Sequence, residues 1–306
     1  MKLFARAPGK VNLCLFVGSL RRDGLHDILT LIEAVSLADE LTLETRVALD
    51  DVVVCPGVEE PNIATRTLAA LRARGWDAPR VRVTIRKQIP IAGGMGGGSA
   101  DAAAVLRMAQ RLVPIDDDAV SEVAADLGSD VPSLLRPGLV LATGAGEQVD
   151  VRAPIASHAL VIVPLPHRLS AGAVYAEADR LGLREKWFDF VAILPELVSE
   201  LGRGLRLPER FFVNELEPAA VSLCPDIGPA LEAVRAVGAD HAFVSGSGPT
   251  VAGLFWDPPA APGPPAAPAG DGRARAEAAA AALAPRYPGA RCAVPVKRDF
   301  GFPLFV

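Results

Sequence analysis

The first segment whose residues could do chemistry is a glycine-rich turn. It contains Gly93, Gly94, Gly96, Gly97 and Gly98, followed by Ser99, Ala100 and Asp101. It follows a segment that alternates like a strand (81–85) and precedes one with helical spacing (99–112). Glycines allow a ligand to approach the backbone closely, and the free N–H groups at a helix start attract phosphate. The turn is therefore a candidate phosphate site, with a tight structural turn as the alternative.

This turn fits neither of two familiar phosphate-binding motifs. A P-loop needs lysine after its last glycine, where Ser99 stands, and a dinucleotide fingerprint counted from Gly94 needs a third glycine at the same position. The Ser99 hydroxyl could cap the helix or lie near a phosphate or its metal ion.

Composition excludes several classes of protein. The chain has 306 residues, half of them apolar, and a net charge of −5. This suits two globular domains and offers no basic field for nucleic acid. The start, residues 1–10, does not resemble a signal peptide, and no long apolar run predicts a membrane helix. Four scattered cysteines and four scattered histidines predict a cytoplasmic protein with reduced thiols and no transition-metal site.

Apolar spacing predicts an α+β protein. We expect a half-buried strand at 11–17, with Val11, Leu13, Leu15 and Val17 on one face, and helices opening near 61 and at 99–112 and 117–127. Further strands are expected at 41–47, 138–143, 158–164, 242–245, 250–255 and 291–296, and further helices at 171–181, 188–201, 225–237 and 273–283. We place a domain boundary near residue 150, giving domains 1–152 and 153–306. Residues 257–272 predict a loose loop, or else a polyproline ligand.

Three segments, taken in order, resemble the GHMP small-molecule kinases: residues 7–13 (APGKVNL), the glycine turn, and residues 244–250 (VSGSGPT). Residues 22–26 (RDGLH) and 127–132 (LGSDVP) narrow the resemblance to the 4-diphosphocytidyl-2-C-methylerythritol kinases. The resemblance implies a ribosomal-S5-like N-terminal domain and a ferredoxin-like C-terminal domain. It also implies a transferase that uses ATP to phosphorylate the 2-hydroxyl of 4-diphosphocytidyl-2-C-methyl-D-erythritol, in non-mevalonate isoprenoid biosynthesis.

The same resemblance assigns catalytic roles to Lys10 and Asp130. Asp130 would accept or orient the proton of the substrate hydroxyl, and Lys10 would stabilise the charge that develops. Spacing alone favours a helix cap for Asp130, since Val131-Pro132 follows, and a solvated charge for Lys10. Asn12 would share a strand face with Lys10 and contact the substrate.

Nucleotide contacts also follow from the resemblance. Gly93, Gly94, Gly96, Gly97, Gly98, Ser99 and Ala100 would surround the ATP phosphates. Asn62 would meet the adenine, unless it only starts a helix. Lys87 is expected near the nucleotide only from its position just before the glycine turn. Mg²⁺ would be held mainly by phosphates and water, with protein ligands undetermined.

The cytidine part of the substrate would meet His26, which can both donate and accept hydrogen bonds, and Tyr175, which would stack on the base. Core packing is the alternative for Tyr175. Leu25 stands where the family usually has an aromatic residue, so one side of the base would lack a π-face.

Leu25 keeps open a GHMP kinase acting on another alcohol, such as mevalonate or homoserine. A nucleotide-binding regulatory protein is a third possibility, which the presence of both Lys10 and Asp130 disfavours. We expect no nucleic-acid or membrane partner, and a monomer or homodimer.

Overall fold

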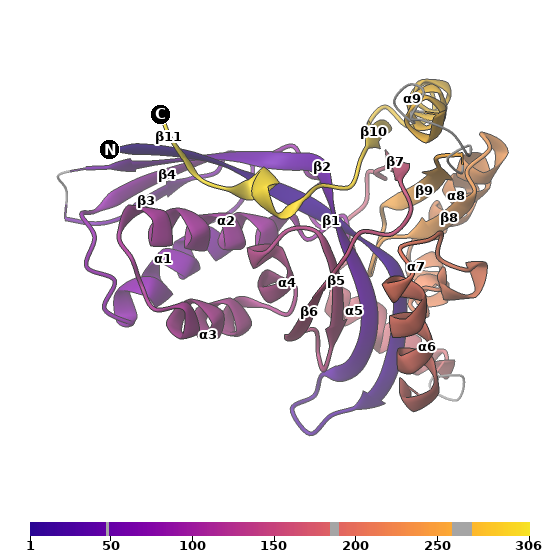
Figure 1. Cartoon of the computed structure of the whole chain (residues 1–306), viewed down its shortest axis with the longest axis horizontal. Helices are drawn as coiled ribbons and strands as arrows, with labels where there is room; N and C mark the ends of the chain where they lie inside the picture. Colours follow the sequence, from indigo (N-terminus) through magenta and orange to yellow (C-terminus); the bar gives the residue numbers. More distant parts are fainter. Residues whose placement is uncertain (47–48, 184–189, 259–270) are drawn as a thin grey trace.

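The computed structural model describes residues 1–46, 49–183, 190–258 and 271–306, which form two β-sheets covered by helices (Figure 1). The first sheet has the order β11-β1-β2-β4-β3, and β5 and β6 extend it from β2. Its strands are β1 (Lys2–Leu20), β2 (His26–Thr45), β3 (Val52–Val54), β4 (Val81–Arg86), β5 (Leu139–Thr143), β6 (Gln148–Arg152) and β11 (Leu304–Phe305).

The long β1–β2 hairpin differs from the half-buried strand expected at 11–17. Both faces of this stretch are buried, and the pairing register shifts between Asn12 and Cys14. A bulge of this kind inserts a residue and reverses which face the following side chains occupy. As a result Val11 and Leu13 pack in the core of the first sheet, whereas Leu15 and Val17 pack in that of the second. The expectation of one common face was wrong for this reason.

Four helices cover one face of the first sheet (Figure 1). They are α1 (Ile63–Ala73), α2 (Gly97–Leu112), α3 (Asp117–Leu127) and α4 (Val131–Leu135). The range expected for α3 agrees with the structure, because Asp116 caps its start and Gly128 ends it. Helix α2 begins two residues before the expected Ser99, with Gly96 as N-cap in the left-handed region, so Ser99 is not the cap.

The second sheet has the order β10-β7-β9-β8 and carries the remaining helices. Its strands are β7 (His158–Val163), β8 (His241–Val244), β9 (Val251–Trp256) and β10 (Arg291–Ala293). The accompanying helices are α5 (Ala171–Arg180), α6 (Phe190–Gly202), η2 (Glu209–Phe211), α7 (Glu217–Leu223), α8 (Ile227–Ala236) and α9 (Asp271–Leu283). Apolar spacing does not predict α7, because two turns are too short to show a helical period. Helix α8 begins two residues after its expected start at residue 225. Most of the loop expected at 257–272 lies outside the described residues.

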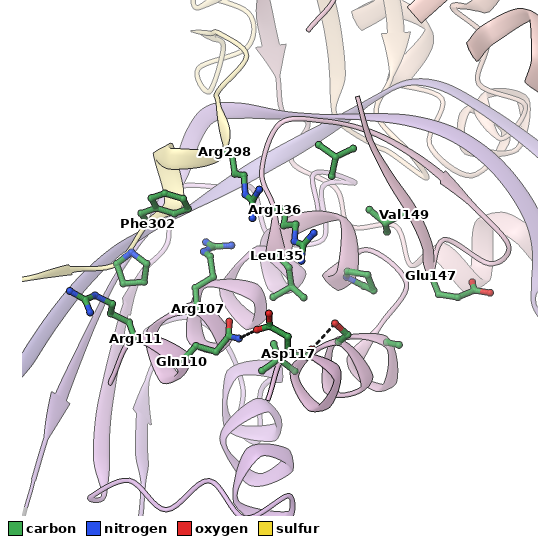
Figure 2. A pocket seen from close by; sticks show the side chains of 16 residues that line it. Arg107, Gln110, Arg111, Asp117, Leu135, Arg136, Glu147, Val149, Arg298 and Phe302 are labelled. Carbon is green, nitrogen blue, oxygen red and sulfur yellow. Dashed lines mark hydrogen bonds between the residues drawn. The ribbon is translucent and has the colours of Figure 1, made fainter. Parts of the chain in front are cut away.

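The C-terminal segment returns to the first sheet, where β11 pairs with β1 after the short helix η3 (Arg298–Gly301). The two termini consequently lie close together (Figure 1). The segment also borders a cavity of about 720 Å³ with α2, α3, α4 and β6 (Figure 2). The division at residue 152 stays a prediction. Within the described part of the chain, none of the helices has the length and apolar character that crossing a bilayer requires.

Candidate active site

Lys10 and Asp130 form an ion pair where β1 passes the start of α4. The Lys10 Nζ lies 3.3 Å from Asp130 Oδ2 and donates a hydrogen bond to Asn12 Oδ1 at 2.7 Å. The lysine side chain is buried, whereas a third of the aspartate side chain is exposed. The Lys10 ammonium is therefore held in place from inside, and the carboxylate faces the open side.

The orientation of Asn12 follows from its neighbours. The Thr30 hydroxyl donates to the Cys14 carbonyl at 2.7 Å, so it accepts from Asn12 Nδ2 at 2.8 Å. The amide oxygen then points to Lys10. This chain of hydrogen bonds confirms that Lys10 and Asn12 share a face of β1, and it holds the ammonium toward Asp130.

The helix-cap alternative for Asp130 does not describe its side chain. Asp130 occupies the N-cap position of α4, but its carboxylate accepts no capping hydrogen bond. Only its backbone carbonyl takes part, accepting from the Ser133 hydroxyl at 2.8 Å. The carboxylate is thus directed to Lys10 instead of to the helix.

The glycine turn packs against the turn at 244–250, far along the chain. The Ser245 hydroxyl donates to the Gly94 carbonyl at 3.1 Å, and the Thr250 N–H donates to the Gly93 carbonyl at 3.2 Å. The Lys10 N–H donates to the Met95 carbonyl at 3.0 Å. The fold therefore brings the three motif segments into one site.

Glycine is required at two positions of this turn. At Gly94, with φ +78°, an added Cβ would lie 2.2 Å from the Ser245 carbonyl oxygen. At Gly96, with φ +64°, it would lie 3.1 Å from Lys10 side-chain carbons. At Gly98, by contrast, a Cβ would meet only Ile63, at 3.5 Å. Tight packing explains the first two glycines, while the open first turn of α2 leaves its N–H groups available to a ligand.

Lys87 lies beneath the turn, between two carboxylates. Its Nζ is 2.5 Å from Asp39 Oδ2 and 2.7 Å from Asp101 Oδ2, and 3.3 Å from where a Cβ on Gly97 would be. Burial raises the pKa of Asp101 to about 7, since desolvation and the charge of Asp39 outweigh the attraction of Lys87. Lys87 thus supports the start of α2, and its contact with a nucleotide stays a prediction.

Asn62 starts helix α1, which was the alternative to an adenine contact. Its Oδ1 accepts from the Thr65 N–H at 3.1 Å, and its Nδ2 donates to Glu60 Oε1 at 2.6 Å. The side chain is buried. Both ends of the amide have protein partners, and the adenine contact remains untested.

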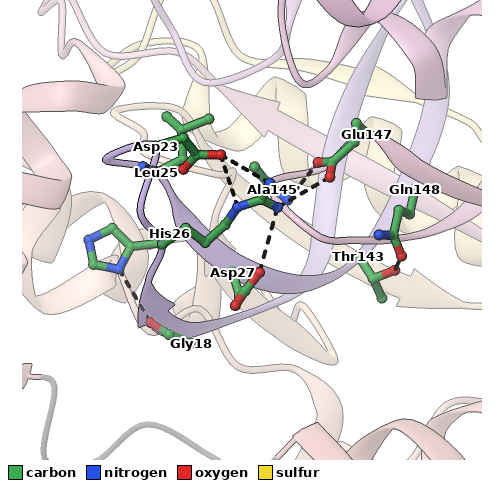
Figure 3. Close-up of polar contacts among 10 residues, drawn as sticks. Gly18, Asp23, Leu25, His26, Asp27, Thr143, Ala145, Glu147 and Gln148 are labelled. Atoms are coloured by element: carbon green, nitrogen blue, oxygen red, sulfur yellow. Dashed lines mark hydrogen bonds and ion pairs between the residues drawn. The ribbon is translucent and has the colours of Figure 1, made fainter.

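His26 and Tyr175 stack on each other, with ring centroids 5.3 Å apart and an angle of 11° between planes. The His26 Nδ1 lies 3.2 Å from the Gly18 carbonyl (Figure 3), and its Nε2 lies 3.8 Å from Asp179 Oδ1. Both neighbours, the Gly18 carbonyl and the Asp179 carboxylate, are acceptors, so each ring nitrogen faces a group to which an N–H could donate. Burial raises the pKa of Tyr175, with a further contribution from the charge of Asp130, so this pair belongs to the same region as the catalytic candidates.

Leu25 lies at the tip of the β1–β2 hairpin and is about half exposed, at 54%. Its N–H donates to Asp23 Oδ1 at 3.0 Å, and Arg21 links Asp23 to Glu147 (Figure 3). The turn is thus held by polar contacts, while the leucine side chain remains largely uncovered.

Sequence reasoning missed three residues that position this site. Thr30 and Asp39 are buried polar residues within β2, and Arg107 is a buried arginine in α2. Polar residues inside an otherwise apolar strand or stripe were the available signal, but their partners are distant in sequence. In the part of the chain that the structure describes, no group of three or more His, Cys, Asp or Glu side chains could hold a metal ion.

Comparison with known proteins places these features in a family. Residues 62–138 match the family model for the GHMP kinases N terminal domain, and residues 193–263 match that for the GHMP kinases C terminal. A 4-diphosphocytidyl-2-C-methyl-D-erythritol kinase of Streptomyces avermitilis is 41% identical over 266 residues, covering 84% of this chain and 89% of the relative. The kinase of the same name from Mycolicibacterium smegmatis is 40% identical, over 84% of this chain and 82% of the relative.

The chain belongs to the 4-diphosphocytidyl-2-C-methyl-D-erythritol kinase family. The crystal structure of a 4-(cytidine 5'-diphospho)-2C-methyl-D-erythritol kinase superposes with a TM-score of 0.76 and 29% identity, over 96% of this chain and 99% of the other. A mevalonate kinase from L. major shares the fold, with a TM-score of 0.68, 15% identity and 96% of each chain covered. Membership in this kinase family confirms the predicted α+β GHMP fold and the assignment as a small-molecule kinase. It also favours the predicted function over a regulatory protein.

Proposed function

We propose that this kinase transfers the γ-phosphate of ATP to the 2-hydroxyl of 4-diphosphocytidyl-2-C-methyl-D-erythritol. The observation that carries the proposal is the Lys10–Asp130 ion pair beside the glycine turn. Phosphoryl transfer needs an oriented hydroxyl and charge neutralisation more than covalent chemistry. A buried ammonium next to a partly exposed carboxylate supplies both.

In this proposal Asp130 accepts a hydrogen bond from the substrate hydroxyl and takes its proton as the oxygen attacks phosphorus. Lys10 pairs with Asp130 and stabilises negative charge on the transferred group. Asn12 and Thr30 hold the Lys10 ammonium, so that no reorganisation is needed during the reaction.

The ATP phosphates would lie against the first turn of α2, whose N–H groups at 97–99 have no partner within the helix. Ser99 is the side chain that would contact a Mg²⁺ ion, with phosphate oxygens and water supplying the other ligands. The ion would neutralise phosphate charge when bound. Lys87 would add positive charge beneath the turn.

The cytosine would be read by His26 and Tyr175. A neutral imidazole offers one donor and one acceptor, so the ring of His26 can read the edge of a base. Tyr175 would stack on the base, and the exposed Leu25 would contribute apolar contact only.

The test is ADP release by the pure chain with ATP, Mg²⁺ and the CDP-linked alcohol, compared with mevalonate and homoserine. Turnover with an unlinked alcohol alone would favour a different GHMP kinase. Asp130→Asn should lower kcat by roughly 10²–10⁴-fold with near-normal ATP binding. The matched control is Asp126→Asn, an exposed aspartate of α3 paired with Arg74, which should keep wild-type kcat. A kcat for Asp130→Asn within about threefold of wild type would refute the role.

A further inference from the structure

The cavity beside η3 is lined by charged and apolar side chains that have no role in the proposed function. It has a volume of about 720 Å³ and lies between α2, α3, α4, β6 and the C-terminal segment (Figure 2). None of the residues assigned above to ATP or to the CDP-linked substrate lines it. A concave site of this size is typical of small-molecule binding.

Its lining is positively charged in a chain that is negative overall. Four arginines line it, namely Arg107, Arg111, Arg136 and Arg298, against two carboxylates, a formal charge of +2. Both carboxylates already have partners. Asp117 accepts from Gln110 Nε2 at 2.8 Å, and Glu147 accepts from Arg21 Nη1 at 3.2 Å.

The arginines have no carboxylate partner among the residues that the structure describes. Arg107 donates only to backbone carbonyls, and Arg111 lies over the ring of Phe305. Within the described ranges, the side chains of Arg136 and Arg298 make no ion pair or hydrogen bond. Burial lowers the pKa of Arg107 to about 10, which is the effect expected of a cation without a counter-ion. Guanidinium groups in this state favour a phosphate ligand.

The remaining wall of the cavity is apolar and partly exposed. Leu135 and Val149 line it, as do Val151 and Phe302, which are 48% and 52% exposed. Figure 2 shows Arg136 and Leu135 at the end of α4, facing the same space as Arg298 from η3. One ligand could therefore bind both kinds of surface if it combined an anionic group with an apolar group.

We propose that this cavity binds a small organic phosphate, held by Arg136 and Arg298 with its apolar part against Val149 and Val151, and that the bound ligand acts on Asp130 through α4. The binding step is independent of the proposed function, whereas the effect on Asp130 rests on it.

The route to Asp130 is short. Pro132 and Leu135 belong to α4, whose N-cap is Asp130, and both line the cavity. Arg107 donates to the Leu134 carbonyl of α4 at 2.6 Å and to the Arg6 carbonyl of β1 at 3.2 Å. A ligand that displaces α4 would therefore change the position of Asp130 relative to Lys10, which is carried by β1.

Binding is tested by calorimetry with hexyl phosphate, in the presence of a saturating non-hydrolysable ATP analogue that occupies the phosphate site of the glycine turn. Hexanol and inorganic phosphate are the probes for each half of the ligand. We expect hexyl phosphate to bind more tightly than either. Arg136→Ala and Arg298→Ala should each weaken it roughly tenfold, about 1.4 kcal/mol. Arg291→Ala, an exposed arginine of β10, is the matched control and should bind as wild type. Equal affinity of wild type and the double variant would overturn the site.

Coupling is tested by kcat at saturating ATP and CDP-linked substrate. Hexyl phosphate should change kcat at least threefold in wild type and leave it unchanged in the Arg136→Ala/Arg298→Ala double variant, whose basal kcat should be normal. An unchanged kcat in wild type with proven binding would overturn the coupling. Failure of the proposed function would appear differently, as absence of ADP release in every sample without the probe.

Discussion

Arg107 joins three segments that carry or support the candidate active site, so its replacement by methionine should destabilise the protein strongly. It lies in α2, is 8% exposed, and donates to the carbonyls of Gly301 at 3.0 Å, Leu134 at 2.6 Å and Arg6 at 3.2 Å. Methionine would fill the volume of the aliphatic stem but leave all three carbonyls without their donor.

The expected loss follows from two opposing quantities. A hydrogen bond from a charged donor contributes about 1.5–3 kcal/mol, so three of them contribute roughly 5–9 kcal/mol. Against this, burial lowers the pKa of Arg107 from 12.5 to about 10, a desolvation cost of roughly 3 kcal/mol that methionine avoids. The net expectation is a decrease of about 2–6 kcal/mol in the free energy of unfolding.

The assay is urea unfolding of wild type, Arg107→Met and the control Arg111→Met. Arg111 lies four residues further along the same helix and is exposed, and its guanidinium carbon lies 4.7 Å from the centroid of the Phe305 ring. The control should lose less than about 1 kcal/mol. A free energy of unfolding for Arg107→Met within about 1 kcal/mol of wild type, or an equal loss of stability in the two variants, would refute the role of Arg107.

Three further predictions concern charge and recognition. Burial alone would lower the pKa of His158, but the charge of Glu33, whose carboxylate lies 2.8 Å away, outweighs burial, and the pKa is raised. The resulting stabilisation of the folded state is complete below about pH 6.5 and is lost as pH rises through the folded-state pKa. The free energy of unfolding should therefore fall between pH 6 and 9 in wild type but not in Glu33→Gln, and equal pH slopes for the two proteins would contradict this. Lys87→Met should lower the free energy of unfolding by about 3–5 kcal/mol at pH 8, and by less at pH 5, where Asp101 is protonated. Urea unfolding measures this, and a loss of stability that does not depend on pH would count against it. Leu25→Tyr should lower KM for the cytidine substrate in the ADP-release assay, and an unchanged KM would mean that residue 25 does not cover the base.

Local elements of the fold could be predicted wherever the determining contacts are close in sequence. The range of α3 followed from its apolar spacing, its acidic start and Gly128, all within a few residues. The face of Leu15 and Val17 could not be predicted, because a bulge in the β1–β2 pairing reversed it, and a bulge depends on the partner strand.

The sequence by itself determined the family and the chemical type of the site, since glycines before a helix, a lysine in β1 and an aspartate before α4 are local patterns with restricted uses. The tertiary structure decided how these residues meet. It showed that Asp130 pairs with Lys10 without capping its helix, that Gly94 is needed for packing on Ser245, and that Arg136 and Arg298 face one cavity. The physical reason is that hydrogen bonds, burial and charge act over a few ångströms in space, between residues that sequence spacing leaves far apart.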